Sequence, residues 1–251
     1  MELENKENIV YGRNAVRELL KKGTETDKIF VIRSEKSGSL GQLIALAHER
    51  HIPVLECDKS KLDKMTDGGV HQGICAVTSS VSYVDVDDIL NIADGKGQSP
   101  FIVIADGIED PHNLGAIIRT CECAGVHGLI IPKRRCATVN GTAAKASAGA
   151  VSHLPIAKVT NIPSVIDDLK KRGVWIYAAD FGGTEYFNCD FSGGVCLVLG
   201  AEGRGVSQLV RSKCDFTVSI PMMGCVNSLN VSCAAAVILN EIAKQKYILN
   251  K

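Results

Sequence analysis

The sequence predicts an α/β protein with two domains, a small α/β domain followed by a larger one built on an open parallel sheet. Helical and strand patterns alternate along roughly the first 80 residues, whereas after residue 100 the apolar runs become longer and richer. Those later runs are continuous instead of alternating, as is typical of parallel strands covered by helices on both faces. A chain of 251 residues can bury a sizeable core in this arrangement.

The small domain is predicted to span residues 1–82. A helix is expected from Asn14 to Lys22, where Gly23 provides a stop, and the run K-I-F-V-I-R predicts a buried strand at 28–33. The cycle then repeats with a helix at 40–50, a strand at 52–55, a helix at 60–65 and a strand at 73–78. These elements suffice for a self-contained α/β domain.

Residues 83–99 are predicted to be a linker with one short helix, and residues 100–251 the larger domain. Its strands are expected at 101–105, 128–132, 174–180, 195–200 and 216–221, and its helices at 113–124, 143–149, 163–171, 206–211 and 231–247. This order predicts an open sheet of five or six strands. Binding sites in such sheets lie at the carboxyl ends of the strands.

Composition limits the classes of function. Basic and acidic residues both total 28, so no global field attracts nucleic acid or an acidic membrane, and any nucleic-acid contact must come from local patches. The ten cysteines are scattered without a C-x-x-C, which predicts mostly buried, reduced thiols in a cytoplasmic protein without a metal site. No apolar run approaches the length of a membrane span, and the N-terminus is acidic and polar, so secretion and membrane insertion are not expected.

Polar residues that could carry chemistry gather at three transitions from strand to loop to helix. In the first, Asn113 stands at the mouth of a helix, and Arg119 follows six residues later, a spacing that a straight helix does not place on one face. A cap at Asn113 and a solvated charge at Arg119 would explain these two residues equally well. The second, L-V-L-G-A-E-G-R-G-V-S at 197–207, has three glycines in six residues.

Those glycines would let a ligand approach the backbone closely, although a purely structural turn is the alternative. The third transition, residues 216–232, ends in N-S-L-N-V-S, which holds more small polar side chains than one helix cap requires. If the three loops meet at the sheet edge, they form a neutral polar pocket. No glycine fingerprint of a dinucleotide site and no lysine-bearing phosphate loop is present.

Together the three segments resemble a known family. H-N-L-G-A-I-I-R-T, L-V-L-G-A-E-G-R-G and S-I-P-M-x-G-x-V-x-S-L-N-V-S are similar, in order and spacing, to the three motifs of the SpoU (TrmH) branch of the SPOUT RNA methyltransferases. Residues 8–80 resemble the L30e-like substrate-binding domain that precedes the catalytic domain in 23S rRNA guanosine-2′-O-methyltransferases. Y-G-R-N-A-V, H-Q-G-I and K-A-S-A-G-A-V strengthen this closer resemblance.

The resemblance implies a trefoil-knotted catalytic domain that binds S-adenosylmethionine and works as a homodimer. The knot would involve residues 200–205 and the segment from Pro221 into the last helix. The implied reaction is methylation of a ribose 2′-hydroxyl in RNA. A guanosine of 23S rRNA is the favoured substrate, and tRNA is the alternative.

The resemblance also implies roles for individual residues. The matching catalytic or site-forming positions are Asn113, Arg119, Glu202, Ser228 and Asn230, and the backbones expected to hold the cofactor are those of Gly200, Ile220 and Leu229. Arg119 is expected to polarise the ribose hydroxyl and an adjacent phosphate, because a guanidinium is always protonated and a poor base. Glu202 is expected to pair with Arg119 or Arg204. The basic residues expected to contact RNA include Arg13, Arg17, Arg134 and Arg135.

Two other classes of function compete with this interpretation. One is an RNA-binding protein of the same fold that has lost activity, against which the intact set of matching residues argues. The other is a dinucleotide-dependent oxidoreductase, suggested by the α/β alternation alone.

Overall fold

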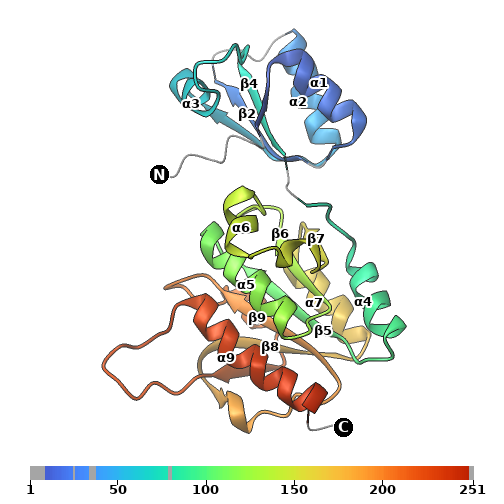
Figure 1. Cartoon of the computed structure of the whole chain (residues 1–251), viewed down its shortest axis with the longest axis vertical. Coiled ribbons are helices and arrows are strands. Elements are labelled where there is room, and N and C mark those ends of the chain that lie inside the picture. Colours follow the sequence, from blue (N-terminus) through green and yellow to red (C-terminus); the bar gives the residue numbers. More distant parts are fainter. Residues whose placement is uncertain (1–8, 25, 34–37, 79–80, 249–251) are drawn as a thin grey trace. The chain divides into compact units, whose positions relative to one another are not determined.

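The chain folds into two compact units (Figure 1). The computed structural model describes residues 9–24, 26–33, 38–78 and 81–248. One unit comprises Met1–Ser82 with Thr138–Thr142, and the other comprises Tyr83–Ala137 with Ala143–Lys251. Residues 83–99, predicted as a linker, therefore fall within the larger unit.

The small unit is built on a four-stranded sheet. Its elements, in chain order, are β1 (Ile9–Tyr11), α1 (Arg13–Lys22), β2 (Thr26–Ile32), α2 (Ser39–Glu49), β3 (Val54–Cys57), α3 (Lys59–Met65) and β4 (Ile74–Thr78). The strand order is β1-β4-β2-β3, in which β4 runs antiparallel to both neighbours and β2 pairs in parallel with β3. Helices cover both faces of this sheet.

Alternation along β2 divides the small unit into two cores. Ile29 and Val31 pack with Val16 of α1 and Leu43 of α2 on one face. Phe30 faces the other way and packs with Leu62, Cys57, Cys75 and Val77, so α3 covers the opposite face. Each face therefore buries its own apolar set, as a three-layer α/β arrangement requires.

The larger unit contains a six-stranded sheet. Its strands are β5 (Phe101–Asp106), β6 (Gly128–Pro132), β7 (Ile156–Val159), β8 (Val174–Glu185), β9 (Gly194–Gly200) and β10 (Phe216–Ser219). The order is β10-β8-β9-β5-β6-β7, and every neighbouring pair is parallel. The predicted parallel sheet of five or six strands is confirmed.

Helices connect these strands and cover both faces of the sheet. They are α4 (Val86–Gly95), α5 (Pro111–Cys123), α6 (Gly141–Ala146), α7 (Ile162–Lys171), α8 (Gln208–Arg211) and α9 (Val231–Ala243), with 3₁₀ turns η2 (Ala150–Ser152) and η3 (Tyr186–Asn188) and a final π-helical turn η4 (Lys244–Ile248). Figure 1 shows α5 and α9 in front of the sheet.

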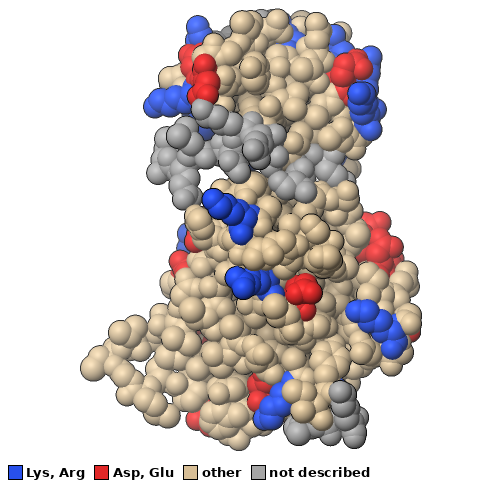
Figure 2. All heavy atoms as spheres, in the orientation of Figure 1, with Lys and Arg blue, Asp and Glu red and all other residues tan. Residues whose placement is uncertain are grey.

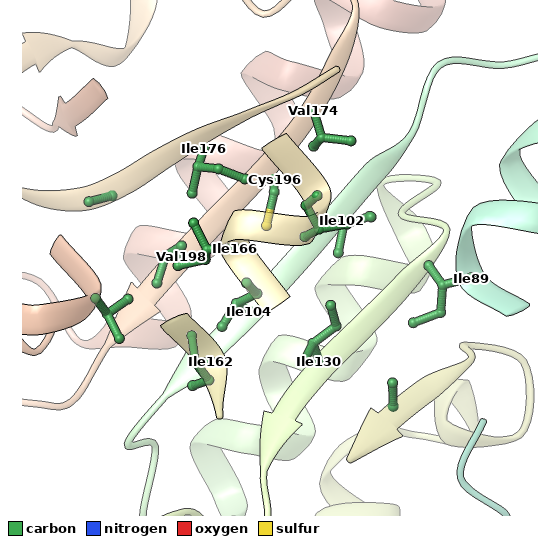
Figure 3. Close-up of a cluster of buried hydrophobic side chains, with 14 of the residues drawn as sticks. Ile89, Ile102, Ile104, Ile130, Ile162, Ile166, Val174, Ile176, Cys196 and Val198 are labelled. Carbon is green, nitrogen blue, oxygen red and sulfur yellow. The ribbon is translucent and has the colours of Figure 1, made fainter. Parts of the chain in front are cut away.

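The opposite face is packed by α4, α7 and α8. Ile102 and Ile104 of β5 point toward this layer, where they meet Ile89 of α4 and Ile166 of α7 (Figure 3). Ile89 is fully buried. The segment predicted as a linker thus supplies part of the core of the larger unit, because its helix is amphipathic.

Several boundaries differ from the predicted ones. Strands β1 and β7 are short, with three and four residues, and the sequence pattern did not predict them. Strand β8 continues to Glu185, beyond the predicted residue 180, and its end pairs with β10 across a register shift at Thr217/Val218. The last α-helix ends at Ala243 and continues as a π-helical turn. All ten cysteines are free thiols, but only four are buried, so the expectation that most are buried is wrong.

Candidate active site

The three strand-to-loop-to-helix segments predicted from the sequence meet at one edge of the sheet. Asp106, the last residue of β5, lies opposite Gly200, the last residue of β9. The loops after these strands therefore leave the same edge of the sheet side by side. The third loop follows β10 and leads into α9, and Figure 1 shows it projecting from the unit.

A cluster of amide and carboxylate side chains joins the three loops. Asn113, in the first turn of α5, is 8% exposed and donates from Nδ2 to Oε1 of Glu202 at 2.9 Å. Asn230 donates from Nδ2 to the same Glu202 oxygen at 2.8 Å and to Oδ1 of Asn113 at 3.0 Å. Residues 89 and 117 positions from Asn113 thus meet in one hydrogen-bonded cluster.

Asn230 also caps helix α9. Its Oδ1 accepts hydrogen bonds from the backbone N–H of Ser232 at 2.9 Å and from the Ser232 hydroxyl at 2.6 Å. These two donors fix which end of the amide faces the helix, so the NH₂ group is directed toward Asn113 and Glu202. The sequence alone indicates no role for Ser232. In the structure, its two hydrogen bonds orient the Asn230 amide.

A cavity of about 510 Å³ lies beside this cluster. Its lining includes all three residues predicted to hold the cofactor, Gly200, Ile220 and Leu229, and three of the predicted catalytic residues, Glu202, Ser228 and Asn230. Asn113 joins them through its two hydrogen bonds. Apolar side chains such as Val218 and Ile238 line other parts of the wall, which suits a small organic ligand with a few polar contacts.

Gly200 is a residue at which a side chain cannot fit. A Cβ added there would lie 2.0 Å from the carbonyl carbon of Gly205 and 2.1 Å from the backbone nitrogen of Val206. The two ends of the glycine loop pass this closely because Ala201 and Gly205 exchange backbone hydrogen bonds of 3.0 and 2.9 Å. The glycines therefore permit a tight loop at the cavity wall.

Two polar contacts that the sequence did not predict hold this loop in place. Ser207 donates from its backbone N–H and its hydroxyl to Oδ2 of Asp106 at 2.9 and 2.6 Å. Asp180, which lines the cavity, forms an ion pair of 3.0 Å with Arg211 of α8. The sequence points to Asp106 and Asp180 only by their position, because each stands at the end of an apolar strand run.

The charges around the cavity balance. Its lining contains Asp180, Glu202 and Arg204, and Arg211 pairs with Asp180, so two carboxylates face two guanidiniums among the described residues. The ion pair expected between Glu202 and Arg119 or Arg204 does not occur in the described part of the chain. Glu202 accepts hydrogen bonds from two neutral amides instead.

The remaining predicted residues lie outside the cavity. Arg119 is exposed on α5, and the described residues give it no hydrogen bond or ion pair. Arg134 and Arg135 are exposed in the loop that follows β6. Strand β6 runs parallel to β5, so this loop leaves the same edge of the sheet as the loop after β5. Arg13 and Arg17 are part of the small unit, where both line a separate hollow.

No group of three or more potential metal ligands is present in the described ranges. No helix in the described part of the chain is long and apolar enough to cross a membrane.

Two known families match this chain, one for each part of the sequence. Residues 100–240 match the SpoU rRNA methylase family, and residues 9–84 match the substrate-binding domain of RNA 2′-O-ribose methyltransferases. The chain belongs to the SpoU methylase family. The residues that line the cavity and Asn113, which is hydrogen-bonded to two of them, all lie within the region matched to the methylase family.

Relatives that match nearly the whole chain are assigned to the TrmH family. YacO of Bacillus subtilis, assigned to the TrmH family of tRNA/rRNA methyltransferases, is 40% identical over 238 residues, or 94% of this chain and 95% of that protein. A Staphylococcus aureus (strain MSSA476) protein with the same assignment is 40% identical over 95% of this chain and 96% of its own.

Solved structures of SpoU enzymes resemble this fold. AviRb of Streptomyces viridochromogenes, crystallised with S-adenosylmethionine (AdoMet), is 27% identical with a TM-score of 0.59, covering 94% of this chain and 89% of that one. The TrmH/SpoU tRNA-modifying enzyme of A. aeolicus is 31% identical with a TM-score of 0.55, covering 63% of this chain and 82% of its own. This SpoU chain is therefore a methyltransferase of the SpoU/TrmH family with an N-terminal substrate-binding domain.

Proposed function

We propose that this enzyme transfers a methyl group from AdoMet to the 2′-hydroxyl of a ribose in RNA, with a guanosine of 23S rRNA as its target. The observation that carries the proposal is the juxtaposition of the cavity with the Asn113–Glu202–Asn230 cluster. Family membership and the AdoMet complex of AviRb support the choice of methyl donor.

The cavity fits such a donor in size and chemistry. A volume of about 510 Å³ lies in the range of small-molecule sites. The backbones of Gly200, Ile220 and Leu229 would hold its methionine and adenine parts, and all three residues line the cavity. When bound, AdoMet supplies an electrophilic methyl group on a cationic sulfur.

The balanced charge of the cavity suits methyl transfer. The positive charge of the donor disappears in the reaction, so a strongly anionic pocket would stabilise the ground state more than the transition state. Neutral amides and compensated carboxylates avoid that cost. The reaction breaks a sulfur–carbon bond, forms an oxygen–carbon bond and releases the hydroxyl proton.

The chain's own residues are proposed to position the ribose. Ser228 offers a hydroxyl at the cavity wall. Asn113 and Asn230, whose amides Glu202 holds in one orientation, fix the wall beside it. In-line displacement depends on such alignment of donor and acceptor. Arg119, exposed on α5, is proposed to engage the phosphate next to the target ribose and to polarise the hydroxyl.

Domain composition favours rRNA as the substrate. The tRNA-modifying enzyme of A. aeolicus matches only 63% of this chain. The unmatched part of this chain is about as long as its N-terminal domain. A tRNA substrate is the second candidate, because that same enzyme is 31% identical to this chain. We further propose, from the family resemblance, a trefoil knot that involves residues 200–205 and the segment from Pro221 into the last helix, a homodimer, and a cytoplasmic location.

Mapping 2′-O-methyl groups by mass spectrometry tests the substrate. We expect 23S rRNA from cells lacking the gene to lose one 2′-O-methylguanosine, and tRNA from the same cells to stay unchanged. Loss of a tRNA methyl group with unchanged rRNA would contradict the rRNA assignment and favour the second candidate.

A further inference from the structure

The small unit contains a hollow of about 800 Å³ that lies outside the proposed catalytic site. It is bounded by the starts of three helices and by the loop between α3 and β4. The lining side chains with polar or charged groups are Arg13, Asn14, Arg17, Ser39, Lys59, Asp63, His71 and Gln72. We call this feature the small-unit hollow.

Internal hydrogen bonds hold the loop at the floor of the hollow. His71 is 6% exposed, and its Nδ1 accepts the backbone N–H of Gly73 at 3.0 Å. Nε2 therefore carries the proton and donates to Oδ1 of Asp63 at 3.0 Å. The single carboxylate of the lining is thus already engaged by His71.

The same loop positions Arg13. The side-chain Oε1 of Gln72 accepts the backbone N–H of Arg13 at 3.0 Å, and the carbonyl of Gln72 accepts Nε at 3.0 Å. Nη1 donates to the hydroxyl of Ser39 at 3.0 Å. The guanidinium is held at the wall of the hollow in a fixed orientation.

The lining carries an excess of positive charge. Among the described lining residues Arg13, Arg17 and Lys59 are cationic and Asp63 is anionic, a formal excess of two positive charges. The whole chain has 28 basic and 28 acidic residues, so this excess is a local feature. Phosphate groups are the anions that arginine and lysine in such a setting bind well.

An exposed aromatic ring stands beside the hollow. Tyr11 is 40% exposed, and its ring lies against Gly69, one of the lining residues. A Cβ added at Gly69 would lie 2.7 to 2.8 Å from three ring atoms of Tyr11, so only glycine allows this placement. Exposed tyrosines beside basic residues serve as stacking platforms for unpaired bases.

We propose that the small-unit hollow binds a single-stranded stretch of the RNA substrate, with its phosphates at Arg17 and Lys59 and one unpaired base stacked on Tyr11. Arg13 completes the phosphate site, while His71 and Gln72 position the loop. The proposal rests on the proposed function for the identity of the polymer, since residues 9–84 match a substrate-binding domain. It adds the place, the residues and the unpaired state of the RNA.

Salt-dependent RNA binding by the full-length protein tests the phosphate contacts. The probe is a fluorescent single-stranded RNA of about a dozen nucleotides, titrated at several salt concentrations. Each phosphate contact removed from single-stranded RNA lowers the slope of log K against log salt by about 0.7. We expect Arg17→Ala and Lys59→Ala each to weaken binding several-fold and to lower the slope by about that amount. The matched control is Lys22→Ala, which removes an exposed lysine of α1 outside the hollow.

Substitutions of Tyr11 test the stacking contact. We expect Tyr11→Phe to bind like the unmodified protein, and Tyr11→Leu, which fills the space without an aromatic face, to bind about fivefold or more weakly. The corresponding RNA duplex should bind the Tyr11 variants equally, because its bases are already stacked. Thermal melting of each variant excludes loss of the fold as the cause.

The proposal is overturned if Arg17→Ala and Lys59→Ala match Lys22→Ala in affinity and salt slope, or if Tyr11→Leu binds single-stranded RNA normally. Failure of the proposed function would be seen separately, as absence of methyl transfer by the unmodified protein whatever its RNA affinity.

Discussion

Asn230 shows how one side chain serves a helix and a reaction site together. Its oxygen caps α9, and its NH₂ group joins Asn113 and Glu202. A serine in this position could cap the helix equally well but could not reach both partners. The surplus of polar residues in front of α9 is thereby explained for Asn230 and Ser232, and Ser228 lines the cavity.

Replacing Asn230 separates the two roles. We expect Asn230→Ser to change the free energy of unfolding by less than about 1 kcal/mol, because serine is a comparable N-cap. Methyl transfer should fall at least tenfold, because Glu202 and Asn113 lose a shared donor. The matched control is Asn161→Ser, which changes the N-cap of α7, where Asn161 accepts the Ser164 N–H at 3.2 Å.

Denaturant unfolding and single-turnover methyl transfer measure the two effects. If Asn230→Ser and Asn161→Ser retain the same activity, Asn230 is only a cap.

The sequence predicted most of the residues that meet in the hydrogen-bonded cluster and the cavity wall, because they lie in short motifs at the ends of apolar runs. It did not predict the partner of Glu202, since two amides distant in the chain provide the hydrogen bonds. It also did not predict the roles of Tyr11 and His71. Their environment depends on a loop whose shape comes from tertiary hydrogen bonds and left-handed residues such as Gln72.

At the scale of elements, close backbone contacts explain several glycines. Strand β8 approaches β10 so tightly that a Cβ on Gly183 would lie 2.2 Å from the carbonyl oxygen of Thr217. The register of the two strands shifts at this point. The sequence predicted both strands, but not the extension of β8 that creates this contact.

We expect Gly183→Ala to destabilise the larger unit by about 1–3 kcal/mol, because backbone must move to accommodate the methyl group. Gly95→Ala is the control, since nothing lies within 4 Å of a Cβ there and the residue is helical. That control should be neutral or slightly stabilising.

Fluorescence of the single tryptophan, Trp175, reports unfolding of this unit because Trp175 belongs to β8. Equal denaturation midpoints for the two alanine variants would contradict the close contact.

The predicted strands agree best with the observed ones where the apolar runs are long. Continuous runs such as 101–105 and 195–200 became central strands β5 and β9, whose residues are almost all buried. Edge strands β1 and β7 are mostly apolar but only three and four residues long, so their pattern was too short to predict. The amphipathic helix α4 was predicted within a linker, because sequence alone does not reveal which core a short helix joins.

At the scale of the molecule, the chain has no net charge, and on the face shown in Figure 2 acidic and basic residues are interspersed. Bulk attraction to RNA is therefore weak, and local sites must supply affinity. Methyl transfer is proposed for the cavity of the larger unit and RNA capture for the hollow of the small one, and the two linings share no described residue.

The most direct test of the central claim is label transfer by the purified protein. 23S rRNA from cells lacking the gene is incubated with the protein and AdoMet carrying a tritiated methyl group, then digested to nucleosides and separated. We expect label in 2′-O-methylguanosine, and much less label in that nucleoside when the Asn230→Ser variant is used. Label on a base instead of a ribose, or no transfer to rRNA or tRNA by a protein that binds AdoMet, would contradict it.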